Sequence, residues 1–370
     1  MKKNFLIFSV LVFNAICTYG QGCNDVLLQQ KAGIWKEAAK GAVSGIATSD
    51  LAREKSALTA LHSMIKAKYS PMGVVGEVSF AYNRPYPNMP ANSYYYSILA
   101  LNYFCENNTL KTEHETSTSF QISVNSFEAE IYDTINVSEI SSGTGYHYMP
   151  DMPVEKDGYF YFKEKDVILG FGIPGKTSQW LITFDGKLPY AYVTKKEFLE
   201  KRKLILANAR RGEAAGIEDV LKNIEIEKKF KEAEFKNDPE KLKKYLKMDY
   251  LNIRERYEKQ MSDLDKTYQP AFNKIESLLN TGGSDLSQPA IVKADPKDYL
   301  SYLFTDDNDP MGQVLLKPNP AYFSKKFPRS SPQFFSVIIT GNQKDPVAAS
   351  FMAAIIKATD FTALKNMLGK

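Results

Sequence analysis

The clearest chemical motif in the chain is a phosphate-loop pattern, G-x-x-x-x-G-K-[ST]. It is formed by Gly170, Gly175, Lys176 and Thr177. In nucleotide-binding proteins the glycine-rich backbone and the lysine hold phosphates, and a helix begins at the lysine-threonine pair. Here the pair leads into residues 178–184, which are β-rich and end at a turn dipeptide, so no helix fits. We therefore predict a connection between two strands and no ATP binding.

His147 is the candidate general base. It precedes Asp151 by four residues, and a histidine beside an acid can take a proton from a hydroxyl group or water. Ser141 and Ser142 come just before it, so the segment holds the residue types of a serine hydrolase. The Gly-x-Ser-x-Gly turn that presents many such serines does not occur in the sequence. We expect a loop histidine, and we keep a secreted hydrolase that uses His147 and Asp151 as the alternative function.

The metal-binding patterns are incomplete. Residues 113–115 read Glu-His-Glu and resemble the start of H-E-x-x-H, but the position of the second histidine is occupied by Thr118. Residues 306–309 are rich in carboxylates but lack the glycine and the distal glutamate of a calcium loop. We therefore expect no metal site and no cofactor.

Tyrosines and prolines are concentrated between residues 82 and 96. Exposed tyrosines beside rigid prolines can form a platform for a glycan or a peptide. The plainer interpretation, which we favour, is a loop that enters a strand whose alternate tyrosines are buried. The candidate ligand-binding residues are Tyr82, Arg84, Tyr86 and Tyr94.

Residues 1–20 have the layout of a secretory leader. Lys2 and Lys3 form a basic start, Phe5–Phe13 is almost wholly apolar, and the segment ends in small and polar residues at Gly20. We expect export to the periplasm or the medium, with outer-membrane association left open. Removal of the two lysines lowers the formal net charge from +4 to +2, which gives no reason to expect nucleic acid as a partner. No later stretch reaches about 18 apolar residues, so we predict no transmembrane helix.

Two cysteines, Cys23 and Cys105, remain after cleavage at Gly20. An oxidising compartment favours a disulfide between them. Lipidation of Cys23 is the competing interpretation, because small residues precede it, although the usual aliphatic residue three places earlier is missing.

The elements that position these residues indicate an α+β fold. Apolar residues at three- and four-residue steps predict a helix over 49–69. Phe120, Ile122 and Val124 alternate with polar residues, which is typical of a half-buried strand. An antiparallel β domain of six or seven strands is therefore expected within residues 21–193. Its candidate strands are 74–82, 93–104, 118–133, 158–169, 178–184 and 188–193.

Residues 194–280 predict a helical hairpin. Thr194 and Glu197 form a capping box, and Asp238 with Pro239 restarts a second helix. That helix carries a long apolar stripe, which is a natural surface for a protein partner where it is exposed. The candidate partner-binding residues are Tyr257, Met261 and Tyr268.

The C-terminal segment, 281–370, is expected to be rich in loops. It contains one predicted strand at Phe334–Thr340 and a final helix that begins at Asp345 and Pro346. Taken together, the sequence favours an exported, non-catalytic protein that binds an envelope protein, a glycan or a peptide.

Overall fold

The computed structural model is an α+β protein, as predicted, and its contacts divide it into two compact units. The structure describes residues 25–38, 43–84, 91–126, 133–134, 147–149, 152–184, 186–297, 300 and 302–370. Unit 1 contains the described parts of Met1–Ala129, Pro153–Tyr190 and Pro318–Lys370, and unit 2 those of Glu130–Met152 and Ala191–Lys317.

Unit 1 is built on a nine-stranded sheet, counted over the described residues, with the order β1-β2-β3-β5-β15-β10-β9-β8 and with β4 paired to β3. Only the pairing of β1 with β2 is parallel among these strands. The C-terminal strand β15 lies between β5 and β10, in the middle of the sheet. The strands are β1 Ile34–Glu37, β2 Val74–Arg84, β3 Ser93–Glu106, β4 Thr109–Thr112, β5 Ser119–Val124, β8 Val154–Lys156, β9 Tyr159–Ile168, β10 Pro174–Ile182 and β15 Phe335–Gly341.

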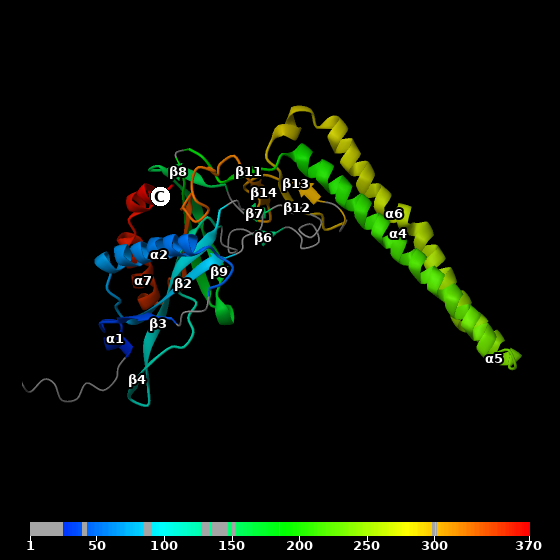
Figure 1. Cartoon of the computed structure of the whole chain (residues 1–370), viewed down its shortest axis with the longest axis horizontal. Helices are drawn as coiled ribbons and strands as arrows, with labels where there is room; N and C mark the ends of the chain where they lie inside the picture. Colours follow the sequence, from blue (N-terminus) through cyan, green and yellow to red (C-terminus); the bar gives the residue numbers. More distant parts are fainter. Residues whose placement is uncertain are drawn as a thin grey trace, which may run out of the picture. The chain divides into compact units, whose positions relative to one another are not determined.

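Helices pack against one face of this sheet and enclose the main hydrophobic core (Figure 1). Alternate residues of the strands point to this face, as the two-residue period of a strand requires. From the helices, the core takes Leu58, Leu61 and Ile65 of α2 and Phe351 and Ile355 of α7. The helices of unit 1 are α1 Asp25–Leu28, α2 Thr48–Lys68, α7 Pro346–Ala358 and α8 Phe361–Met367.

Helix α7 begins where the sequence predicted. The Asp345 side chain accepts hydrogen bonds from the backbone N–H groups of Val347 (2.9 Å) and Ala348 (3.5 Å), and Pro346 occupies the first turn. This cap fixes the start of the helix beside the end of β15, and so it places α7 over the sheet.

The predicted helical hairpin forms most of unit 2. Thr194 caps α4 by accepting a hydrogen bond from the Glu197 N–H (3.2 Å), and Asp238 caps α5 through the Lys241 N–H (3.2 Å). Helices α4 and α6 run side by side with α5 at their far end (Figure 1). Its helices are α4 Lys195–Glu234, α5 Pro239–Tyr245, the π-helical turn η2 Leu246–Tyr250 and α6 Leu251–Thr281.

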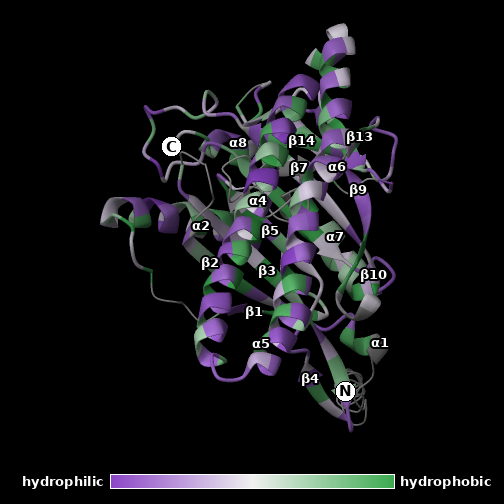
Figure 2. Cartoon of the chain, turned by 90° about the vertical axis from the view of Figure 1, so that its right-hand side faces the viewer, coloured by the Kyte–Doolittle hydropathy of each residue, from purple (hydrophilic) through white to green (hydrophobic). Residues whose placement is uncertain are grey.

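A second sheet completes unit 2, with the order β13-β12-β14-β7-β6 and with β11 paired to β14. The strand predicted at 188–193 therefore joins this sheet as β11. Hydrophilic and hydrophobic segments are interleaved along α4 and α6, as expected for helices with one buried side (Figure 2). The strands are β6 Asp133–Thr134, β7 His147–Met149, β11 Tyr190–Tyr192, β12 Ile291–Ala294, β13 Tyr302–Phe304 and β14 Gln313–Pro318.

No single helix among the described residues is both long and apolar enough to cross a membrane, as predicted. The pair α7 and α8 meets the length and composition criteria only when taken together, and the two helices are bent by 51°. Several residues of α7 are buried in the core of unit 1, among them Phe351 and Ile355.

Candidate functional site

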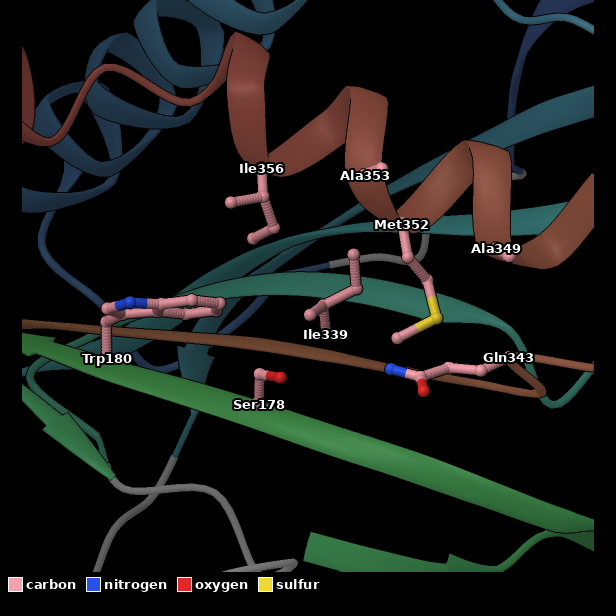
Figure 3. Close-up of a pocket in the computed structure, with 8 residues that line it drawn as sticks. All are labelled: Ser178, Trp180, Ile339, Gln343, Ala349, Met352, Ala353 and Ile356. Atoms are coloured by element: carbon pink, nitrogen blue, oxygen red, sulfur yellow. The ribbon is translucent and has the colours of Figure 1, made fainter. Parts of the chain in front are cut away.

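A cleft between α7 and β10, called here the α7–β10 cleft, has a mainly apolar lining (Figure 3). Its volume is about 430 Å³, which is within the usual size range of small-molecule sites. The lining residues are Ser178, Trp180, Ile339, Gln343, Ala349, Met352, Ala353 and Ile356.

The cleft follows from the side-chain periods of its walls. Ser178 and Trp180 are two residues apart in β10, so both point to the face that α7 covers (Figure 3). On α7, Ala349, Ala353 and Ile356 are spaced by four and three residues and line the same side of the helix. The two alanines leave the space that larger side chains would fill.

Aromatic rings support one end of the cleft. The ring centroid of Trp180 lies 5.7 Å from that of Tyr161 and 5.7 Å from that of Phe361. Phe361 in turn stacks on Tyr159 at 5.0 Å. Such contacts hold the indole in place, so this wall is formed before any ligand arrives.

Hydrogen-bonding side chains also line the cleft: Ser178 lies in its middle, and Gln343 lies at the end away from Trp180 (Figure 3). The carboxylate of Glu164 accepts hydrogen bonds from Lys176 Nζ (2.5 Å), from Ser178 Oγ (3.3 Å) and from Gln343 Nε2 (3.3 Å). The hydrogen bond from Lys176 is the main cause that lowers the pKa of Glu164 below its usual value, so the carboxylate stays charged. A ligand in the cleft would therefore meet an aromatic wall at one end and hydrogen-bonding groups in the middle and at the other end.

The phosphate-loop residues form a β-hairpin, in agreement with the predicted connection between two strands. The short 3₁₀ turn η1 (Gly170–Gly172) joins β9 to β10, and Lys176 and Thr177 lie within β10. Lys176 forms an ion pair with Glu164, and the Thr177 hydroxyl group is hydrogen-bonded to Thr340 Oγ1 (2.8 Å). Both motif side chains therefore have structural partners within the sheet.

The predicted tyrosine platform is only partly described. Tyr94 is buried, and its hydroxyl group donates a hydrogen bond to the backbone carbonyl of Ser330 (2.7 Å). Burial raises the pKa of Tyr94 far above its usual value. Arg84 ends β2, Tyr86 lies outside the described residues, and Tyr82 lines a separate pocket. The structure therefore places Tyr82 and Tyr94 in different surroundings.

That pocket lies between α2 and β2 and is called here the α2–β2 pocket. It has a volume of about 470 Å³ and a mixed polar and aromatic lining. His62, which the sequence analysis did not propose, belongs to it, together with Lys55 and Thr59 of the same helix. Their spacing of four and three residues is the signal that could have grouped them. The lining residues are Glu37, Val43, Leu51, Lys55, Thr59, His62, Phe80 and Tyr82.

The described part of the chain does not bring the predicted hydrolase residues together. His147 was expected in a loop, but its backbone lies in strand β7 and pairs with Leu316 of β14. Asp151, Ser141 and Ser142 lie outside the described residues. The hydrolase alternative therefore stays a prediction.

The candidate partner-binding residues lie in the packed interior of the hairpin. Tyr268 is 7% exposed, and its hydroxyl group donates a hydrogen bond to Glu213 Oε2 (2.9 Å). Tyr257 and Met261 are partly buried against the same core. The stripe thus joins α6 to α4, and its proposed role in binding a partner stays a prediction.

The acidic turn at residues 306–309 is tied to neighbouring side chains. Asp309 Oδ2 accepts hydrogen bonds from Lys293 Nζ (2.5 Å) and Thr305 Oγ1 (2.7 Å), and these partners lower the pKa of Asp309 to about 2.

Glu113, from the Glu-His-Glu pattern, accepts a hydrogen bond from the backbone N–H of Asn102 (3.2 Å), and burial raises the pKa of Glu113. Within the described part of the chain, no three or more His, Cys, Asp or Glu residues are grouped to hold a metal ion.

The predicted leader, residues 1–20, and Cys23 both lie outside the described residues. Cys105 lies in β3, paired with Leu110 of β4. Export, the Cys23–Cys105 disulfide and the lipidation of Cys23 therefore stay predictions.

No protein-family model matches the chain, and no curated protein or solved structure matches it either. Its function must therefore be inferred from its own sites rather than from its fold.

Proposed function

We propose that the protein is an exported, non-catalytic binding protein, and that the α7–β10 cleft holds the apolar part of its ligand. The observation that carries this proposal is the apolar lining of the cleft, with Trp180, Met352 and Ile356 around a volume of about 430 Å³. Transfer of an apolar group from water to such a surface is favourable, by roughly 25 cal/mol per Å² buried.

The lining of the cleft indicates an amphipathic ligand. An aromatic or branched aliphatic body fits beside Trp180 and Ile356, where the walls offer no charge. Hydrogen-bonding groups of the ligand fit beside Ser178, in the middle of the cleft, and beside Gln343, at the end away from Trp180 (Figure 3). Because both residues donate to Glu164 and are held by it, they are oriented before the ligand binds.

Export is supported by the leader-like residues 1–20. Mass spectrometry of the mature protein, taken from the periplasmic fraction and the medium, tests this part of the proposal. We expect an N-terminus at Gln21, and a product that keeps Met1 would contradict it. The same spectrum reports a diacylglyceryl adduct on Cys23 if the lipidation alternative holds.

The cleft is testable because the chain has two tryptophans, Trp35 and Trp180. In the Trp35→Phe variant, Trp180 is the only tryptophan, and it lies in the wall of the cleft. We expect saturable energy transfer from Trp180 to the apolar dye anilinonaphthalene sulfonate. Ala353→Leu should then weaken dye affinity at least about tenfold, because the added side chain fills the cleft (~1.4 kcal/mol).

Ser350→Leu is the matched control, since Ser350 is exposed on α7 and does not line the cleft. It should leave the dye affinity unchanged. Equal dye affinities in the Ala353→Leu and Ser350→Leu variants would overturn the assignment of the cleft. Turnover of an ester, peptide or glycan substrate that is lost in His147→Ala would favour the hydrolase alternative instead.

A further inference from the structure

The α2–β2 pocket has a chemical character different from that of the α7–β10 cleft. The pairing of β1 with β2 ends at Glu37 and Val78. The pocket lies beside the part of β2 that comes after Val78. One wall consists of α2, where Lys55, Thr59 and His62 lie on one side of the helix. The pocket therefore offers a ligand both hydrogen-bonding groups and apolar surface, the latter from Val43, Leu51, Phe80 and Tyr82.

The histidine in this pocket is held in a defined orientation. Its Nδ1 atom lies 3.2 Å from the hydroxyl oxygen of Tyr96, a fully buried residue whose pKa is raised by burial. Either tautomer of a neutral imidazole forms this hydrogen bond, because the Tyr96 hydroxyl group can donate to Nδ1 or accept from it, and in both cases the bond fixes the ring. Burial is the main cause that lowers the pKa of His62, which favours this neutral form.

Aromatic side chains fix the histidine from two sides. The ring of Trp35 meets the ring of His62 edge-on, with centroids 5.4 Å apart, and Phe80 meets it in the same way at 6.1 Å. These contacts leave the imidazole little freedom to reorient. The pocket thus has a hydrogen-bonding imidazole held in one orientation on its wall.

The two walls of the pocket are also joined to each other. Glu54 of α2 is fully buried, and its Oε2 atom accepts a hydrogen bond from the backbone N–H of Asn83 in β2 (2.9 Å). Its Oε1 atom lies 3.4 Å from Asn92 Nδ2. The Glu54 side chain therefore joins the end of β2 to α2 beside the pocket, and a wall formed in advance lowers the entropy lost on binding.

The lining matches a neutral, polyhydroxylated ring. The Lys55 side chain can donate hydrogen bonds to a ligand, that of Glu37 can accept them, and that of Thr59 can do both. Lys55 and Glu37 also place charges of both signs at the pocket. A sugar hydroxyl group also donates and accepts, and it brings no charge that one of these groups would repel. Phe80 and Tyr82 supply aromatic surface for the C–H face of the ring.

We propose that the α2–β2 pocket binds a neutral sugar unit, whose ring packs against Phe80 and Tyr82 and whose hydroxyl groups contact Lys55, Thr59 and His62. This site is separate from the α7–β10 cleft and shares no lining residue with it. Of the tyrosines predicted for a glycan platform, Tyr82 is the one that lines this pocket.

The experiment uses the Trp180→Phe variant of the full chain, in which Trp35 is the only tryptophan and contacts His62. We titrate it with glucose, galactose, mannose and N-acetylglucosamine, and in parallel with tyrosine and phenylalanine as zwitterionic competitors of similar size. At least one sugar should change the Trp35 fluorescence saturably, and neither amino acid should do so.

Thr59→Ala should then raise the dissociation constant for that sugar about fivefold to tenfold, because one hydrogen bond is lost. Ser63→Ala is the matched control, since this exposed residue of α2 loses the same hydroxyl group outside the pocket. Thermal unfolding followed by circular dichroism confirms that both variants fold.

Three results would overturn the proposal: a flat titration with all four sugars, a saturable signal with an amino acid instead, or equal effects of the two alanine substitutions. Because Trp180 is removed, none of these results depends on the α7–β10 cleft. Failure of the sugar site is therefore distinguishable from failure of the proposed function.

Discussion

Helices α2 and α4 are both long, but they are stabilised in different ways. Helix α2 begins after Ala47, whose side chain cannot cap it, and it buries Leu58, Leu61 and Ile65 completely in the core of unit 1. Helix α4 begins at a threonine cap, runs for 40 residues, and exposes much of its length to solvent.

The difference shows where each helix obtains its stability. The buried leucines of α2 contact strands that are distant in the sequence, so its stability comes from tertiary packing. Helix α4 packs mainly on α6, and a threonine cap stabilises its start. It also forms surface ion pairs, and each ion pair contributes little to stability. The same substitution should therefore have very different effects at a fully buried position of α2 and at an exposed position of α4.

The largest expected effect is that of Leu61→Ala in α2. Leu61 is 0% exposed, so the substitution removes buried methyl groups and leaves a cavity. We expect a loss of about 2–5 kcal/mol in the free energy of unfolding. Urea unfolding followed by circular dichroism, which reports the helices of both units, measures it.

Leu204→Ala in α4 is the matched control, because Leu204 is 51% exposed. It should change the free energy of unfolding by no more than about 0.5 kcal/mol. Similar losses for the two leucines would break the comparison, since burial would then not decide the stability of these helices.

The same contrast explains which parts of the fold could be predicted. The starts of α4 and α7 were predicted because the capping chemistry of Thr194 with Glu197, and of Asp345 with Pro346, is contained in a few consecutive residues. The position of β15 was not predictable, because its partners β5 and β10 lie far away in the sequence. Strand order depends on packing between distant segments, which local patterns do not record.

The two pockets show the same distinction between local spacing, which is visible in the sequence, and packing between distant elements, which is not. Trp180 and Met352 each look like ordinary core residues in the sequence, and only the packing of α7 on β10 makes them the walls of one cleft. For the α2–β2 pocket, the spacing of Lys55, Thr59 and His62 was visible. The opposing wall at Phe80 depends on how α2 lies on the sheet, so the pocket itself was not visible.

Thr194→Ala should have an intermediate effect. It leaves the Glu197 N–H at the start of α4 without the hydroxyl group that accepts its hydrogen bond at 3.2 Å. We expect a loss of about 1 kcal/mol in the free energy of unfolding of the hairpin, and faster amide hydrogen exchange in its first turn.

Thr194→Ser keeps the capping oxygen and should retain most of this stability. Hydrogen exchange followed by mass spectrometry distinguishes the two variants. If serine and alanine increased exchange equally, the capping hydrogen bond would not be what stabilises the start of α4.

The smallest expected effect belongs to the ion pair between Lys203 of α4 and Glu276 of α6. The two charged groups are 2.9 Å apart, and their side chains are 46% and 52% exposed, so water screens their attraction. A double-mutant cycle with Lys203→Ala and Glu276→Ala should give a coupling energy of roughly 0.2–1 kcal/mol, smaller at high salt. A coupling energy as large as the loss in unfolding free energy expected for Leu61→Ala would mean that charges rather than the packed interior hold α4 against α6. A coupling energy that does not change with salt would mean the same.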